Sequence, residues 1–456
     1  MGKPLLRRAF RIRADRGLRG SAAAYRFRES LFLLPVVIVI GGIVLALVTG
    51  TVDNALGAQT RVPLTMAMDI DVATWLLSTI AGATITTAGV IFSLTIVSLQ
   101  LASSQLSPRV MRSFIRDRLS QVVIGLLVAT FVYCVLTLPR INGHAMQLAP
   151  RVSVTVAVVL TIVTVITIIA HLDHLAHRLE VGRVVRDIAA EGRAVIDAVA
   201  DTARREQPAP DVDMTPPAES LRVSSRVDGW VSRIDTDRLL ATVPERTTVR
   251  LDTRVGAYVH QGEPLVTVWP SPARADRVRR RLAAAIAVTG GRTMQQDVDF
   301  SFRQLVDIGL RALSAAINDP TTAVEATLRV GSLLRRLLVA PPLGRAISGP
   351  GGRILLRPWE LDPEEYIAHG FDQLRHVAPT QPLVAATILR VLRMLIAHVD
   401  DAGRAELVPA LRKQIDMLLG SLDETPGLHA DDLARLHAIG ADTTDPADHS
   451  HRRLTP

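Results

Sequence analysis

Four long apolar runs occupy the first 170 residues of the chain, and the hydrophobic pattern changes sharply after them. Each run is close to the roughly 20 apolar residues that a helix needs to cross the core of a bilayer. The pattern therefore predicts an α-helical membrane domain over residues 30–170, and its spans are expected at about residues 31–48, 72–106, 121–138 and 152–170.

The second run differs from the other three in its composition. No charged residue occurs between Asp71 and Arg109, yet Gly, Ala, Ser and Thr fill much of this stretch. At helical spacing one side of it carries small and polar residues, here called the small-residue face: Ser78, Gly82, Thr86, Gly89, Ser93, Gln100 and Ser104. Such a face on a membrane helix turns toward protein or water rather than lipid. We expect this helix to be the central helix of the bundle.

The distribution of basic residues predicts the topology. The arm at residues 1–29 and the loop at residues 109–118 are rich in Arg, whereas the loops at residues 51–70 and 139–151 hold few basic residues. Because basic loops stay on the cytoplasmic side, both termini are expected in the cytoplasm.

After residue 170 the pattern becomes that of a soluble α+β part. Residues 171–205 have an amphipathic helical period and predict a stalk, and residues 206–219 form a Pro-rich linker. Short alternating runs over residues 220–270 predict a small β-barrel-like domain. One hairpin in it is similar to those of biotinyl and lipoyl domains, but the region has no Lys to carry a cofactor. Residues 273–441 predict a helical bundle, and residues 442–456 a disordered tail.

The helical part contains an internal repeat. Residues 309–330 and 370–391 align without a gap, and each reads as a helix, a break with Pro and a second helix. Between the copies, residues 348–353 (SGPGGR) predict a flexible loop. The first copy supplies the candidate cytoplasmic site, formed by Asp307, Arg311, Asn318 and Asp319. These residues either hold a ligand or form an ion pair and a helix cap.

Composition and motifs exclude several classes of function. The only cysteine, Cys134, lies in a predicted span, and phosphate-loop, zinc-protease and hydrolase-elbow motifs do not occur. The net charge of +8 comes almost entirely from Arg, which reads as composition bias and not as a nucleic-acid site. We therefore expect no catalytic residue, metal or cofactor.

Two stretches resemble a known family. AGVIFSLTIVSLQLASSQLSPRVMRSFIRDR (residues 88–118) and DIGLRALSAAINDPTTA (residues 307–323) are similar to the bacterial membrane proteins grouped as domain of unknown function 2254. The resemblance extends from the first span to about residue 400. It implies a multi-pass protein of the bacterial inner membrane with a large soluble part, and it carries over no catalytic residue.

Two classes of function remain open. In the first, the chain is a channel-like homo-oligomer with the second span at its centre, Asp69 and Asp71 at the outer mouth, and Arg109 and Arg112 at the inner mouth. The small-residue face would equally serve helix packing without any pathway. In the second class, the chain is a membrane-anchored sensor or scaffold whose soluble part binds a cytoplasmic ligand or protein.

Overall fold

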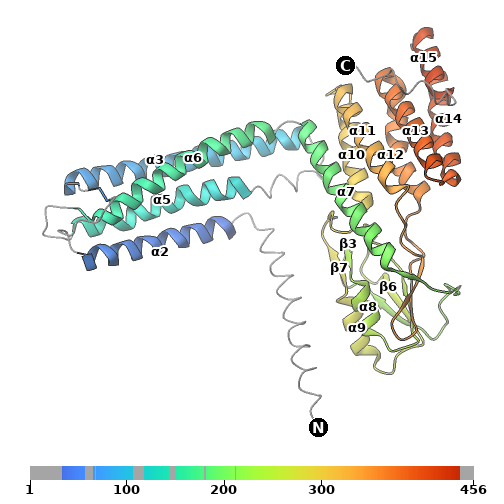
Figure 1. Cartoon of the computed structure of the whole chain (residues 1–456), viewed down its shortest axis with the longest axis horizontal. Helices are drawn as coiled ribbons and strands as arrows, with labels where there is room; N and C mark the ends of the chain where they lie inside the picture. The colour runs from blue at the N-terminus through green and yellow to red at the C-terminus, as the bar shows by residue number, and fades with distance from the viewer. Residues whose placement is uncertain are drawn as a thin grey trace. The chain divides into compact units, whose positions relative to one another are not determined.

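The structure is a computed structural model that describes residues 33–56, 65, 66, 68–105, 118–142, 149–178, 181–210 and 212–441. The chain divides into two compact units, Met1–Glu180 and Val181–Pro456, here called unit 1 and unit 2. Figure 1 shows both units, and each is described by itself below.

The described residues of unit 1 form a bundle of four long helices. They are α2 (Leu33–Leu56), α3 (Ile70–Gln105), α5 (Arg118–Asn142) and α6 (Arg151–Arg178). Helix α5 packs against α2, α3 and α6, so α5 is the central helix of the unit (Figure 1). The expectation that the second span holds this position within the chain was wrong. Helix α3 contacts the bundle through one side only, and the small-residue face is not on that side.

Small side chains explain why α5 lies at the centre. A methyl group added at Gly42 of α2 would lie 3.0 Å from the Cβ atom of Ala129. One added at Gly125 of α5 would lie 2.9 Å from the Cα atom of Pro35. The backbones of α2 and α5 therefore approach closely, as in other membrane helix pairs with small residues at the contact.

Polar groups inside the bundle are paired across helices. The Tyr133 hydroxyl of α5 donates to the Ser153 carbonyl at 3.0 Å and lies 2.9 Å from the Thr49 hydroxyl of α2. At the same end, the Asp53 carboxylate accepts hydrogen bonds from the backbone amides of Val152 and Ser153, at 2.9 and 2.8 Å. These amides belong to the first turn of α6, where backbone N–H groups have no acceptor within the helix. Asp53 of α2 therefore caps α6 from another helix.

Among the residues that the structure describes, five helices are long and apolar enough to cross a membrane: the four of unit 1 and α13 (Pro382–Asp401) of unit 2. The protein is thus a helical membrane protein with a mixed α/β part. Helix α13 packs against α11, α14 and α15 of the same unit.

Unit 2 contains two open sheets. One has the strand order β1-β8-β9-β4-β6-β2 and the other the order β5-β3-β7. The strands are β1 (Gln207–Pro208), β2 (Leu221–Ser224), β3 (Gly229–Ile234), β4 (Thr248–Leu251), β5 (Tyr258–Val259), β6 (Pro264–Trp269), β7 (Ile286–Thr289), β8 (Ala346–Gly349) and β9 (Arg353–Leu356). Two short helices, α8 (Thr236–Thr242) and α9 (Ala275–Ala283), complete this part.

The expectation of a barrel-like domain was wrong, because neither sheet of the described residues closes on itself. Strands from distant segments extend the larger sheet instead: β9 pairs in parallel with β4, and β1, from the expected linker, pairs with β8. The stretch at residues 348–353 is the turn of the β8–β9 hairpin and not a flexible loop. Gly351 and Gly352 have φ angles of 73° and 69°, which other residues rarely adopt.

The remaining helices of unit 2 form a bundle. They are α7 (Val181–Arg205), α10 (Val298–Ala312), α11 (Pro320–Leu337), α12 (Pro363–Val377), α13, α14 (Val408–Asp423) and α15 (Ala430–Ala441), with short 3₁₀ turns at Ala378–Thr380 and Ala405–Leu407. The expected stalk is thus divided between α6 and α7, and α7 buries its apolar side against α10 and α11.

The two copies of the repeat form two helical hairpins, α10–α11 and α12–α13. Glycines at equivalent positions of the copies lie at their contact. A Cβ atom at Gly309 would lie 2.8 Å from the side chain of Leu374, and one at Gly370 would lie 2.9 Å from that of Val330. The copies therefore pack on each other through positions that the repeat relates.

Candidate functional site

The small-residue face lies on the side of α3 that the rest of unit 1 leaves uncovered. The buried residues of this helix form its opposite side: Ala73, Leu77, Ile80, Ala81, Thr84, Ala88 and Ile91. Six members of the small-residue face are exposed: Ser78, Gly82, Thr86, Gly89, Ser93 and Gln100. The side chain of the seventh member, Ser104, lies outside the described residues.

Space is open in front of this face. A Cβ atom added at Gly82 or Gly89 would meet nothing within 4 Å. The Thr86 hydroxyl donates to the Gly82 carbonyl at 2.8 Å, so this hydroxyl is satisfied within its own helix. Trp75, one turn before Ser78, is 69% exposed. The face is therefore not used for packing by the described helices of unit 1.

The predicted mouth charges are only partly described. Asp69 and Asp71 are exposed at the N-terminal end of α3. Arg109 and Arg112 lie outside the described residues. The mouth assignment therefore stays a prediction.

The four residues of the candidate cytoplasmic site lie in two separate parts of the α10–α11 hairpin. Asp307 and Arg311 are half-buried on α10, whereas Asn318 and Asp319 form the break before α11. The Asp319 carboxylate accepts a hydrogen bond from the Thr322 amide at 3.1 Å and caps α11. The hydrogen bonds from Thr322 lower the pKa of Asp319, against a small opposing effect of burial. Asn318 accepts a hydrogen bond from Gln381 at 3.0 Å, which ties the break of one copy to that of the other.

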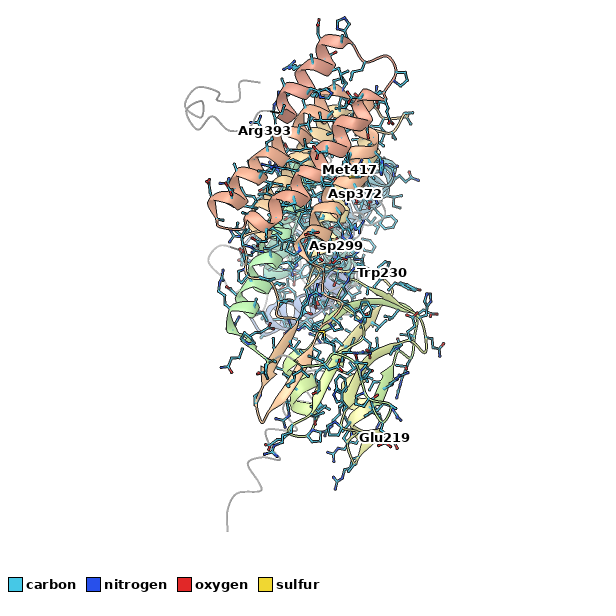
Figure 2. The ribbon with its side chains drawn as sticks, turned by 90° about the vertical axis from the view of Figure 1, so that its right-hand side faces the viewer. Glu219, Trp230, Asp299, Asp372, Arg393 and Met417 are labelled. Atoms are coloured by element: carbon cyan, nitrogen blue, oxygen red, sulfur yellow. The ribbon has the colours of Figure 1, made fainter. Side chains whose placement is uncertain are left out.

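A cluster of buried charges that sequence reasoning missed lies where the bundle of unit 2 meets its sheets. Figure 2 shows Asp299 there, near Trp230. The Arg292 guanidinium donates two hydrogen bonds to Asp297, both 2.8 Å long, and one to Asp299 at 3.0 Å. His369 of α12 lies with Nδ1 2.7 Å from the other Asp299 oxygen. We call Arg292, Asp297, Asp299 and His369 the charge cluster.

Electrostatics and packing both favour the ionised form of this cluster. Burial raises the pKa of Asp299, but the hydrogen bond and charge of His369, with Arg303 and Arg292, outweigh it and hold the pKa well below the ordinary carboxyl value. The Arg292 guanidinium carbon lies 5.5 Å from the ring centre of Trp230 and 5.3 Å from that of Phe300. The cation is therefore held by carboxylates and by aromatic rings.

The cluster fixes how α10 begins. The Asp297 carboxylate accepts a hydrogen bond from the Phe300 amide at 3.0 Å and so caps this helix. The sequence signal for this arrangement was the pair Asp297 and Asp299 at the start of an apolar helical run. The first acid caps the helix and the second lies in its first turn. The partners Arg292 and His369 could not be inferred from that pair.

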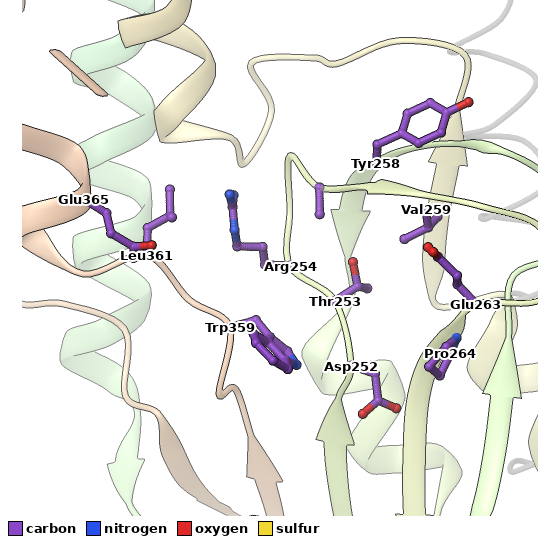
Figure 3. A pocket seen from close by; sticks show the side chains of 11 residues that line it. Asp252, Thr253, Arg254, Tyr258, Val259, Glu263, Pro264, Trp359, Leu361 and Glu365 are labelled. Atoms are coloured by element: carbon purple, nitrogen blue, oxygen red, sulfur yellow. The ribbon is translucent and has the colours of Figure 1, made fainter. Parts of the chain in front are cut away.

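A cavity of ≈ 430 Å³ lies in unit 2 beside the charge cluster. Its lining includes Thr253, Arg254, Tyr258, Glu263, Trp359 and Glu365. Figure 3 shows Arg254, Trp359 and Glu365 on one side of it, with Tyr258 and Glu263 on the other. Its volume is in the range of small-molecule sites.

One carboxyl group behind this cavity has an unusual environment. Burial raises the pKa of Glu360, and the charges of Arg357 and Arg254 counteract only part of this rise. Arg357 pairs with Glu206, so its charge is shared between two acids. The charge of Arg254 thus acts on an acid that is not part of the cavity lining.

The charge cluster is suited to holding elements of unit 2 in place, and the cavity is suited to binding a ligand. Among the residues that the structure describes, no three His, Cys, Asp or Glu side chains are grouped as metal ligands are. The charge cluster joins its members through hydrogen bonds, and the cavity offers charged, hydroxyl and aromatic groups at its surface.

Comparison with known proteins confirms the expected family. A family profile described as Predicted membrane protein (DUF2254) matches residues 28–394. An uncharacterized protein of Mycobacterium bovis and two of Mycobacterium tuberculosis are each 30% identical over 371 residues, which cover 78% of this chain and 69% of the relative. No solved structure matches the chain.

Proposed function

We propose that this chain, which belongs to the predicted membrane protein family DUF2254, is a channel-like homo-oligomer of the bacterial inner membrane whose soluble part regulates it. The observation that carries the proposal is the small-residue face of α3, which unit 1 leaves exposed over six positions from Ser78 to Gln100.

The chemistry of that face favours a protein or water environment. Ser and Gln side chains gain nothing from acyl chains, and glycines let a second backbone approach closely. The pairs Gly82–Thr86 and Gly89–Ser93 have the spacing of small-residue helix contacts. Since no described helix of unit 1 covers them, the partner in this proposal is α3 of other copies around a symmetry axis.

The proposed topology has four spans, α2, α3, α5 and α6, with both termini in the cytoplasm. Helix α13 is apolar enough to span, but its contacts with α11, α14 and α15 support a place in the core of unit 2. The basic arm at residues 1–29 supports the inside orientation.

Cysteine substitution tests the proposal on the full-length protein in lipid nanodiscs. The only native cysteine, Cys134, is buried, so its background reactivity is low. Ser93→Cys is expected to form disulfide-linked oligomers on oxidation and to react with a charged thiol reagent. The matched control is Val90→Cys, since Val90 is exposed on α3 outside the small-residue face.

Conductance separates a channel from simple packing. Reconstituted wild-type protein is expected to conduct in planar bilayers, and Gly89→Leu to abolish the current while Val90→Leu retains it. A monomer by light scattering, or an oligomer that cross-links at Ser93→Cys without conducting, would contradict the proposal. The second outcome would instead favour the membrane-anchored sensor, for which the cavity of unit 2 is the supporting observation.

A further inference from the structure

The cavity of unit 2 contains a buried hydroxyl group without a partner. Thr253 is 7% exposed, and its Oγ1 atom has no hydrogen-bond partner among the described residues. Thr253 lines the cavity just beyond the end of β4. Because an unpaired buried polar group costs about 1–3 kcal/mol, this hydroxyl is a reason to expect a bound hydrogen-bonding group.

The charges at the cavity are not balanced, and the excess is negative. Asp252 is neutralised by Arg250, whose guanidinium lies 2.6 Å from it, and also accepts from the Thr267 hydroxyl at 2.6 Å. The positive charge of Arg254 acts on the half-buried Glu360, whose pKa is raised chiefly by burial. Two acids of the lining, Glu263 and Glu365, remain.

Those two acids use only one oxygen each for the fold. One Glu263 oxygen accepts from the His260 amide at 2.9 Å, and one Glu365 oxygen accepts from the Asp362 amide at 2.9 Å. Neither carboxylate forms an ion pair among the described residues, so both retain capacity for a cationic partner.

Two aromatic rings lie exposed at the same cavity. Tyr258 is 45% exposed and Trp359 is 61% exposed. The Tyr258 ring is held edge-on against Trp230, with the ring centres 5.2 Å apart. Aromatic faces beside carboxylates attract ammonium and guanidinium groups, because the ring quadrupole is negative above its plane.

We infer that this cavity binds an organic cation, an ammonium or guanidinium group on an apolar body. Glu263 and Glu365 balance the charge of the head group, the Thr253 hydroxyl accepts one of its N–H groups, and Trp359 with Tyr258 covers the apolar body (Figure 3). The inference gives the class of ligand that unit 2 binds. Only the effect of this ligand on the membrane helices rests on the function proposed above.

Three probes with one shared body test the charge requirement. They are 4-phenylbutylamine, 4-phenylbutanol and 4-phenylbutanoate, titrated against the full-length protein in nanodiscs by calorimetry and by tryptophan fluorescence. The amine is expected to bind at least about tenfold more tightly than the alcohol, as loss of a charge-assisted contact of about 1.4 kcal/mol implies. Preferential binding of the butanoate would overturn the inference and assign the cavity to anions through Arg254.

Variants locate the probe in the cavity. Glu263→Gln and Glu365→Gln keep the hydrogen-bond acceptors of their turns and are expected to weaken the amine about tenfold each. Asp276→Asn, at an exposed acid of α9 outside the cavity, is the matched control and is expected to leave binding unchanged. Equal binding by all of these variants would refute the inference.

The thermal midpoint of the Thr253→Val variant tests the unpaired hydroxyl without any probe. If the hydroxyl is unpaired without ligand, its removal raises the thermal midpoint of the free protein and weakens the amine. A lower midpoint would show that the hydroxyl has a partner, and would overturn the argument. Binding is measured without current, so failure of this inference is distinguishable from failure of the channel proposal.

Discussion

Gly256 lies where the loop between β4 and β5 touches the charge cluster, and its replacement by Ala provides a sharp test of that cluster. Its φ angle is 82°. A Cβ atom there would lie 2.5 Å from an Asp297 carboxylate oxygen and 2.7 Å from an Arg292 guanidinium nitrogen. Gly262, six residues later, has a φ angle of 93° and nothing within 4 Å of the same position. Gly262→Ala is therefore the matched control.

The two substitutions share one cost and differ in another. Both place a side chain in a left-handed conformation, at about 1–2 kcal/mol. Gly256→Ala must also push apart a carboxylate and a guanidinium that are both buried. Breaking a buried pair costs about 3–5 kcal/mol, and a partial displacement about half of that. We expect a loss of about 4 kcal/mol for Gly256→Ala and about 1.5 kcal/mol for Gly262→Ala.

Thermal unfolding in detergent, followed by tryptophan fluorescence, measures the difference. Arg292 lies beside the Trp230 ring, so the emission of that ring reports on the cluster. At about 2–4 °C per kcal/mol for a unit of this size, the midpoints of the two variants should differ by about 5–10 °C. Equal losses in the two variants would refute the claim that the loop is in contact with the charge cluster.

Three further predictions concern buried polar groups. Asp299→Asn is expected to cost about 3 kcal/mol near neutral pH and progressively less below about pH 4, since a carboxyl with a lowered pKa stabilises the fold fully above its unfolded pKa and loses this effect as the pH falls toward its folded pKa; thermal midpoints across pH measure it. Glu360→Gln should raise the midpoint at pH 8 but not at pH 4, because a raised pKa favours the fold at low pH and the charged form destabilises it; a lower midpoint at pH 8 would contradict this. Tyr133→Phe removes the hydroxyl that donates to Ser153 and should cost about 1–3 kcal/mol, seen as labelling of the buried Cys134 at lower temperature.

Periodicity predicted the elements that depend on local pattern. The four runs of the first unit are helices, because a long apolar segment has one way to satisfy its backbone in lipid. Asp319 and Pro320 begin a helix as expected, since a cap and a proline at the first helical position act within four residues.

What the sequence did not predict depends on contacts between distant segments. The pairing of β9 with β4 joins residues about one hundred positions apart, and nothing in either strand specifies the other. The central place of α5 follows from the fit of Gly125 against Pro35, which only the packed helices reveal. The small-residue face was recognised from spacing, but its position away from the rest of the bundle was not.

The same long-range contacts join the cavity to the helical bundle within unit 2. Arg254 lines the cavity two residues before Gly256, which contacts the charge cluster at the start of α10. Further along α10, Ser301 packs against α7 so closely that a Cβ atom at Gly192 would lie 2.8 Å from its side chain. A ligand that shifts Arg254 is therefore expected to act on a tightly packed series of elements that reaches α7, and interfaces of this kind move as units because packed cores do not deform continuously.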